Sequence, residues 1–186
     1  MRPTVGGDDR SRGGRPLNEA EIRGFLSHDY ARVVNAVALA SGSDPGAEDA
    51  VQEALVRAWI RSERGEHIES LPAWVTSVAL NLSRSGWRRA VAERRASRRV
   101  RAPGEAAAAS ASTEDQVEVA RAIVALPRRE REVAVLRYLL GFDTKETAGV
   151  LRIGEGTVKS SLARARAHLA ERLRVQDLEA NDVEGR

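Results

Sequence analysis

The stretch GFDTKETAGVLRIGEGTVKSSLARARAHL, residues 141–169, decides the fold of the second half of the chain. After Gly141, a cap at Asp143 predicts a short helix to Leu151, and a tight turn leads into a longer helix from Gly156 onward. Two helices joined in this way form a helix-turn-helix, which lays its second helix in the major groove of DNA. The alternative is a two-helix corner of an ordinary bundle.

Two faces of the longer helix favour DNA over the bundle corner. Apolar residues that fill the angle between the two helices are Ala148, Leu151, Ile153, Val158 and Leu162. When each residue is placed about 100° further around the helix axis, small and basic residues alternate on the face opposite the apolar one. The residues predicted to face base edges there are Lys159, Ser160, Ala163, Arg164 and Ala167, with Arg166 and Arg152 to the side and better placed for phosphates.

Together with the residues around it, this motif predicts a small helical domain in the second half of the chain. A capping box at Thr113 and Gln116 starts one helix, and another follows from Arg128 to Leu140. We therefore expect a domain over residues 113–174 and an unpatterned tail over 175–186. Residues 102–112 are Ala, Gly, Pro, Glu and Ser without a pattern, which predicts a flexible linker.

The first half predicts a second helical domain, residues 17–101, behind a disordered tail, residues 1–16. Asn18 and Glu21 form a capping box, and apolar residues then recur at helical steps: Ile22, Leu26, Tyr30, Val33 and Val37. After a break at 41–45, with Asp44 and Pro45 as N-cap and first helical residue, helices are expected at about 47–64 and 71–89. The fold class is therefore all-α: two small helical domains joined by a flexible linker.

Charge and composition narrow the class of protein. The net charge is only +3, but eight arginines follow one another between Arg84 and Arg101 with Glu93 as the one acid among them, which indicates a phosphate-binding face or a solvated tail. Cysteine is absent, and the three histidines (His28, His67 and His168) lie far apart, so neither a metal or cofactor site nor an enzyme is expected. No apolar run approaches the about 20 residues that span a bilayer, and we expect a cytoplasmic protein without membrane insertion.

Two blocks of sequence resemble the sigma factors of bacterial RNA polymerase, in the compact extracytoplasmic-function group of the sigma-70 family that keeps regions two and four. Residues 47–54 with Arg57-Ala58-Trp59 are similar to the region-two signature. Residues 126–133 together with 156–166 are similar to region four. The resemblance covers about residues 22–173, and both blocks in this order are specific.

The resemblance implies roles for individual residues. Asp49, Gln52 and Glu53 would bind the clamp helices of the polymerase largest subunit, which would explain why residues 47–64 are apolar on two sides. Asn81 would contact the exposed strand of the minus-ten promoter element, with the backbone held by Arg84, Arg88 and Arg89, and the loop 63–70 would hold a flipped base. Lys159, Ser160, Ala163 and Arg164 would recognise the minus-thirty-five element.

The same resemblance implies binding partners, and one alternative class of protein stays open. Core RNA polymerase, through its clamp helices and flap, and promoter DNA are the expected partners, and an anti-sigma factor is a further partner left open. The chain departs from the family at Ser85, Thr147, Arg152 and Ser161, where Asp, Ile, Gly and Arg are common. The rival is a stand-alone helix-turn-helix regulator, which would leave the face from Asp49 to Ile60 without a partner.

Overall fold

The computed structural model describes residues 17–42, 46–97 and 114–184, with side chains described over 17–42, 46–84 and 116–173. Within these ranges every regular element is a helix, so the all-α prediction is confirmed. In chain order they are α1 (Glu19–Gly24), the π-helical segment η1 (Phe25–Asp29), α2 (Tyr30–Ser41), α3 (Ala47–Glu63), α4 (Leu71–Ser97), α6 (Glu114–Val124), α7 (Arg128–Tyr138), α8 (Thr144–Leu151) and α9 (Glu155–Glu184). The predicted tail 1–16 and linker 102–112 lie outside the described residues.

The first helical run starts as predicted but changes register. Asn18 and Glu21 make the capping box, with the Glu21 amide 2.8 Å from Asn18 Oδ1. In η1 the amide of Tyr30 donates to the carbonyl of Phe25, a five-residue step that adds one residue to the turn. Phe25 is therefore buried and Leu26 is half exposed, so the prediction that Leu26 points inward was wrong.

The break between α2 and α3 follows from glycine. Gly42 ends α2 in the left-handed region at φ +88°, where a residue without Cβ is unstrained. Gly46 is the N-cap of α3, which begins at Ala47, so the cap and the first helical residue each lie two residues after the predicted Asp44 and Pro45. Residues 43–45 themselves lie outside the described residues.

Helices α2, α3 and α4 pack on one another to make the first domain. Val37, Val51 and Val75, one from each helix, are completely buried. Alanines at steps of three and four along α3, among them Ala54 and Ala58, let these helices approach closely. The bundle holds α3 and α4 so that their remaining faces look outward.

Helices α8 and α9 form the predicted helix-turn-helix. The Asp143 side chain accepts from the Glu146 amide at 2.7 Å and completes a capping box at the start of α8. Arg152 ends α8 at φ +53°, the one described residue other than glycine with a positive φ. Glycine is the residue that the family resemblance leads us to expect here, and the chain instead places an arginine in a conformation that favours glycine.

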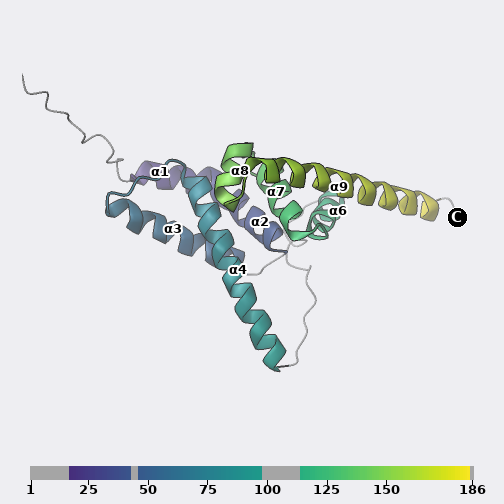
Figure 1. Ribbon diagram of the computed structural model, residues 1–186, viewed down its shortest axis with the longest axis horizontal. Coiled ribbons are helices and arrows are strands. Elements are labelled where there is room, and N and C mark those ends of the chain that lie inside the picture. The colour runs from purple at the N-terminus through teal and green to yellow at the C-terminus, as the bar shows by residue number, and fades with distance from the viewer. Residues whose placement is uncertain (1–16, 43–45, 98–113, 185–186) are drawn as a thin grey trace, which may run out of the picture.

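Two helices are longer than the sequence pattern predicted. α4 continues past Arg89 to Ser97, and α9 runs on to Glu184 through the stretch that we predicted to be an unpatterned tail. Neither extension contains proline, and the next glycine after α9 is Gly185. Good helix formers such as Ala, Leu, Arg and Glu carry both helices beyond their apolar stripes. Both helices project from the packed centre in different directions (Figure 1).

The two halves lie against each other (Figure 1). Helix α7 packs on α2, and α8 packs on the first part of α4. A single cluster of buried apolar side chains extends from Val37 and Val75 in the first half to Leu136 and Leu151 in the second. None of the helices in the described ranges is both long and apolar enough to cross a membrane.

Candidate nucleic-acid and polymerase interfaces

The first half of α9 presents an open polar face. Val158 and Ala165 are completely buried and Leu162 is nearly so, which fixes the rotation of the helix against α8 and α7. Five predicted DNA-contacting residues are all exposed as a result: Lys159, Ser160, Ala163, Arg164 and Arg166. The predicted inward and outward faces of this helix are therefore confirmed.

Arg164 leans toward a buried carboxylate on α7. Its Nε lies 3.6 Å from Glu130 Oε1, while the other oxygen of Glu130 lies 2.6 Å from Nδ1 of His168. Glu130 is only 7% exposed, whereas the side chain of Arg164 remains largely exposed. The guanidinium is thus oriented by α7 but is free to meet DNA.

Arg166 is held by an aromatic residue that the sequence analysis missed. Its Nε donates to the Tyr138 hydroxyl at 2.6 Å, and its guanidinium carbon lies 5.9 Å from the centre of the Tyr138 ring. Tyr138 is 54% exposed at the end of α7 although it is large and aromatic. An exposed tyrosine next to a helix-turn-helix was the sequence signal available, since tyrosine often serves as an amphipathic contact residue.

Two of the family departures turn out to be buried. Thr147 and Ser161 are completely inaccessible, and their hydroxyl oxygens have no hydrogen-bond partner among the described residues. Ser161 stands where Arg is common, and a buried serine does not reach DNA.

Helix α4 carries the residues predicted to meet the minus-ten element. Asn81 is exposed, and its Oδ1 accepts from Arg84 Nη1 at 3.1 Å. The side chains of Arg88 and Arg89 lie outside the described residues. Arg84 is not outward as predicted, because its guanidinium faces the second half of the chain and is mostly covered.

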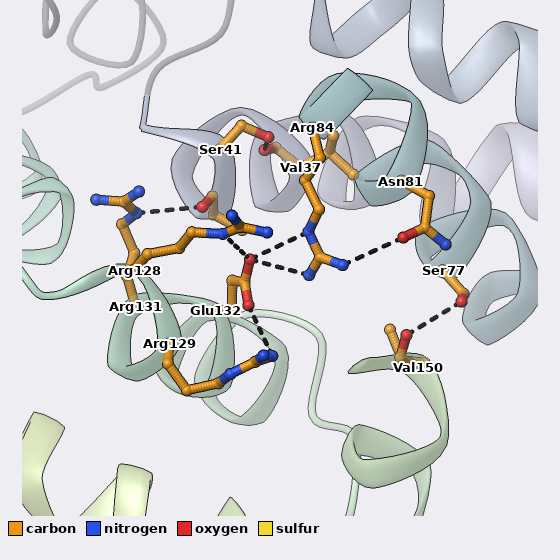
Figure 2. A network of polar contacts seen from close by, with 11 residues as sticks. Val37, Ser41, Ser77, Asn81, Arg84, Arg128, Arg129, Arg131, Glu132 and Val150 are labelled. Atoms are coloured by element: carbon orange, nitrogen blue, oxygen red, sulfur yellow. Dashed lines mark hydrogen bonds and ion pairs between the residues drawn. The ribbon is translucent and has the colours of Figure 1, made fainter. Parts of the chain in front are cut away.

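Glu132 on α7 joins Arg84 to two arginines of its own helix (Figure 2). Oε1 lies 2.9 Å from Arg84 Nη2, 3.2 Å from Arg84 Nε and 2.8 Å from Arg128 Nε, and Oε2 lies 3.1 Å from Arg129 Nη1. The Glu132 side chain is 2% exposed. A buried carboxylate is tolerated because three guanidinium groups neutralise and hydrogen-bond it.

Three further hydrogen bonds cross between the halves. Ser77 donates to the carbonyl of Val150 at 3.1 Å, Arg32 to that of Leu139 at 3.0 Å, and Arg131 to that of Ala40 at 3.1 Å. Burial lowers the pKa of the Arg131 guanidinium, with the Glu132 carboxylate acting in the opposite sense. Ser77 is therefore partly covered.

Helix α3 presents the predicted polymerase-binding face. Asp49, Gln52 and Glu53 are all exposed. Gln52 Nε2 donates to the Tyr30 hydroxyl at 3.2 Å, and Glu53 pairs with Arg57 at 2.8 Å. Beside them lie three large side chains that remain 42–54% exposed, Val56, Trp59 and Ile60.

This combination of a polar edge and an apolar strip is typical of a surface that docks on another protein.

The loop after α3, predicted to hold a flipped base, turns at Gly65, where φ is +77°. Arg61 and Glu66 bridge that loop at 2.6 Å.

Comparison with known proteins identifies the class. Residues 26–93 match the family model of sigma-70 region 2, and residues 116–169 match that of sigma-70 region 4. Two curated relatives from Mycobacterium tuberculosis, the ECF RNA polymerase sigma factors SigM and SigL, are each 33% identical to this chain. The SigM match covers 73% of this chain and 68% of SigM, and the SigL match covers 89% and 95%.

A solved structure agrees with these sequence matches. The sigma factor RpoE of Bartonella quintana, in complex with the anti-sigma factor NepR, matches 85% of this chain and 99% of its own length. The TM-score is 0.70 at 29% identity. These matches define a sigma factor of bacterial RNA polymerase.

Within the sigma-70 family, the chain belongs to the extracytoplasmic-function group. It binds core RNA polymerase and directs transcription initiation at promoters. Region 2 is hereafter the part from α1 to α4, and region 4 the part from α6 to α9.

Proposed function

We propose a division of labour among three faces of this sigma factor. The α3 face (Asp49, Gln52, Glu53) binds the clamp helices of the polymerase largest subunit. The α4 face recognises the minus-ten element through Asn81, with Arg84, Arg88 and Arg89 on the backbone. The α9 face recognises the minus-thirty-five element through Lys159, Ser160, Ala163, Arg164 and Arg166.

The exposed face of α9 carries most of this proposal. Small side chains at Ser160 and Ala163 allow close approach of the helix to base edges in a groove about 12 Å wide. Lys159 and Arg164 flank them and supply donors for guanine acceptors or phosphates. An exposed, partly basic helix face that takes no part in the apolar core favours DNA as its partner.

The α3 face supports the polymerase contact by a different physical argument. Val56, Trp59 and Ile60 expose a strip of apolar surface next to Asp49 and Gln52. Water contact with such a strip is unfavourable, and burial against a partner protein removes it. A stand-alone regulator would have no use for this strip.

The protein in this proposal has no catalytic activity of its own and acts in the cytoplasm, where its polymerase is. Its work is binding: base unstacking and phosphate contacts supply the free energy for opening promoter DNA. The described residues contain no group of three or more metal-ligating side chains, and the proposal requires no metal or cofactor.

A run-off transcription assay with purified core polymerase and fragmented genomic DNA tests the proposal. Discrete transcripts should appear only when the chain and core enzyme are both present. DNA binding that is fully active without core, or failure to co-purify with core, would favour the stand-alone regulator instead.

Two variants then separate the faces. Asp49→Ala and Gln52→Ala should each weaken core binding by about tenfold, the size of one lost interface anchor, and leave upstream DNA binding unchanged. Glu19→Ala, an exposed acid on α1, is the matched control for Asp49. Loss of the same step by Asp49→Ala and Arg164→Ala would contradict the division of labour.

A further inference from the structure

Helix α7 supports two arginines of the α9 face, and it does so at the same atom of each. Nε of Arg166 donates to the Tyr138 hydroxyl at 2.6 Å, and Nε of Arg164 lies 3.6 Å from Glu130 Oε1. The terminal nitrogens of these two arginines make no hydrogen bond to another described residue. The two-pronged end of each guanidinium is therefore available to DNA.

The two supports differ in charge. Tyr138 is a neutral side chain, so Arg166 keeps its full positive charge. Glu130 is a carboxylate that is only 7% exposed, and its negative charge offsets the charge of Arg164. Arg164 thus keeps the hydrogen-bond donors of its guanidinium, while its general attraction for phosphates is reduced.

Glu130 itself is fixed in place. It lies in the first turn of α7, where the helix dipole favours a negative charge. Its second oxygen, Oε2, accepts from Nδ1 of His168 at 2.6 Å, because an ionised carboxylate can only accept. Two small buried residues, Ala134 and Ala165, pack together and let α7 and α9 approach closely.

Glu130 meets α9 at two points. Arg164 and His168 are four residues apart on α9, so they lie one turn apart on the same face, and each faces a different oxygen of Glu130. With Nε turned toward α7, the end of the Arg164 guanidinium that carries Nη1 and Nη2 is left for DNA. Such a pair of donors matches the O6 and N7 acceptors of guanine in the major groove.

We propose that Glu130 is a positioning residue that makes Arg164 select a guanine in the upstream element instead of binding phosphates alone. His168 holds Glu130 in place, while Arg166 on the neutral Tyr138 remains a phosphate contact. The inference rests on the proposed role of Arg164 at the minus-thirty-five element. It adds the base that Arg164 selects and the buried residue on which that selection depends.

The first experiment uses the holoenzyme and a promoter duplex obtained from the run-off assay. Each guanine of the upstream element is replaced in turn by 7-deazaguanine, which pairs normally but lacks the N7 acceptor. At one guanine the replacement should lower the affinity of the parent about fivefold, because one bond of a bidentate contact is lost. This loss should disappear in Arg164→Ala and fall below about twofold in Glu130→Gln, where the guanidinium is no longer held end-on.

The second experiment measures the affinity of the holoenzyme for a mixed-sequence duplex at several salt concentrations. Glu130→Gln leaves the charge of Arg164 without its buried counter-charge, so this affinity should rise. The slope of log affinity against log salt should steepen by about 0.9, the value for one additional phosphate contact. A merely structural role for Glu130 would instead lower the affinity for every duplex and leave the slope unchanged.

Glu171→Gln is the matched control. It removes one negative charge from an exposed position of α9, three residues beyond His168. It should change neither the guanine effect nor the salt slope. Changes as large as those of Glu130→Gln would overturn the inference, because net charge and not the contact with Arg164 would be their cause.

His168→Ala provides an independent variant at a half-exposed side chain. It keeps the charge of Glu130 but removes the bond that holds Oε2, so it should reduce the guanine effect about twofold, the order of one lost hydrogen bond. Circular dichroism checks that Glu130→Gln remains helical. If it does not, His168→Ala decides alone.

The outcomes separate this inference from the proposed function. A guanine effect that disappears in Arg164→Ala but persists in full in Glu130→Gln and His168→Ala would overturn only the role of Glu130. A guanine effect that persists in Arg164→Ala would contradict the proposed role of Arg164 and this inference with it. An upstream element in which no guanine responds to the replacement would overturn the inference and leave Arg164 as a phosphate contact.

Discussion

The DNA faces of α9 and α4 lie in the same chain but are prepared differently. On α9 the backbone and the buried stripe fix the helix, and the polar residues stand exposed. On α4, Arg84 is bound to Glu132, and Ser77 is bound to the carbonyl of Val150. In the proposed division of labour, the α9 face recognises duplex DNA and needs only a rigid helix, whereas the α4 face binds separated strands and acts only after polymerase has bound.

The largest expected effect concerns the core that the two regions share. Leu136→Ala on α7 removes a fully buried side chain and should lower the free energy of unfolding by about 2–5 kcal/mol. Urea unfolding followed by circular dichroism measures this change. A single shifted transition is expected because the apolar cluster spans both regions; loss of only part of the helical signal would mean that they unfold independently. Leu26→Ala, at a half-exposed leucine, is the control and should cost less than about 0.5 kcal/mol.

A smaller effect distinguishes the two DNA faces directly. Arg164→Ala should weaken binding of an upstream-element duplex by about 1–3 kcal/mol and relax its base preference, because we propose that this side chain contacts base edges. Fluorescence anisotropy on the holoenzyme measures it. Arg84→Ala should leave the same duplex affinity unchanged. An equal loss from both variants would erase the distinction between the faces.

Tyr138→Phe is expected to act through Arg166. The change removes the hydroxyl that accepts from Arg166 at 2.6 Å but keeps the ring beneath the guanidinium. Duplex affinity should fall by about 0.5–1.5 kcal/mol, the net value of one hydrogen bond, and by the same amount for matched and mismatched sequences. A loss confined to matched sequences would place Arg166 on a base instead of a phosphate.

The smallest effect is a gain in stability at the turn of the helix-turn-helix. Arg152→Gly should raise the free energy of unfolding by about 1 kcal/mol, since φ is +53° and the left-handed region costs residues with a Cβ. Gly141→Ala, at φ +73° after α7, should have the opposite sign and similar size. Thermal unfolding of the two variants side by side tests both signs. No change in either would mean that these turns relax.

Periodicity and capping were enough to predict most of the helices. The capping box at Asn18 and the cap at Asp143 were predicted because a cap depends on residues close together in sequence. The rotation of α9 followed from Val158, Leu162 and Ala165, since a buried stripe leaves only one face for DNA. These signals are local, and local signals are visible in a sequence.

Other features depended on contacts that no local pattern encodes. Glu132 and Arg84 are 48 positions apart, and charge alone gave no reason to pair them in a chain with 30 basic residues. The same is true of Arg166 and Tyr138. The inward position of Phe25 was missed because the periodicity argument assumed an uninterrupted α-helix. Sequence reasoning therefore identified the polar faces of the helices, but it did not show which of these faces are covered by another part of the same chain.

The π-helical segment η1 makes the joint before α2 tolerant of changes in length. Removing one residue from its five, such as Ser27, would restore an ordinary four-residue step between Phe25 and Tyr30, so that α1 and α2 would keep their relative orientation. The same deletion inside α3 would carry Asp49 and Gln52 off their shared face. In a scan of single-residue deletions through region 2, η1 should therefore be the segment that best tolerates deletion. Segments of different length could then precede it without disturbing the packing of α2, α3 and α4.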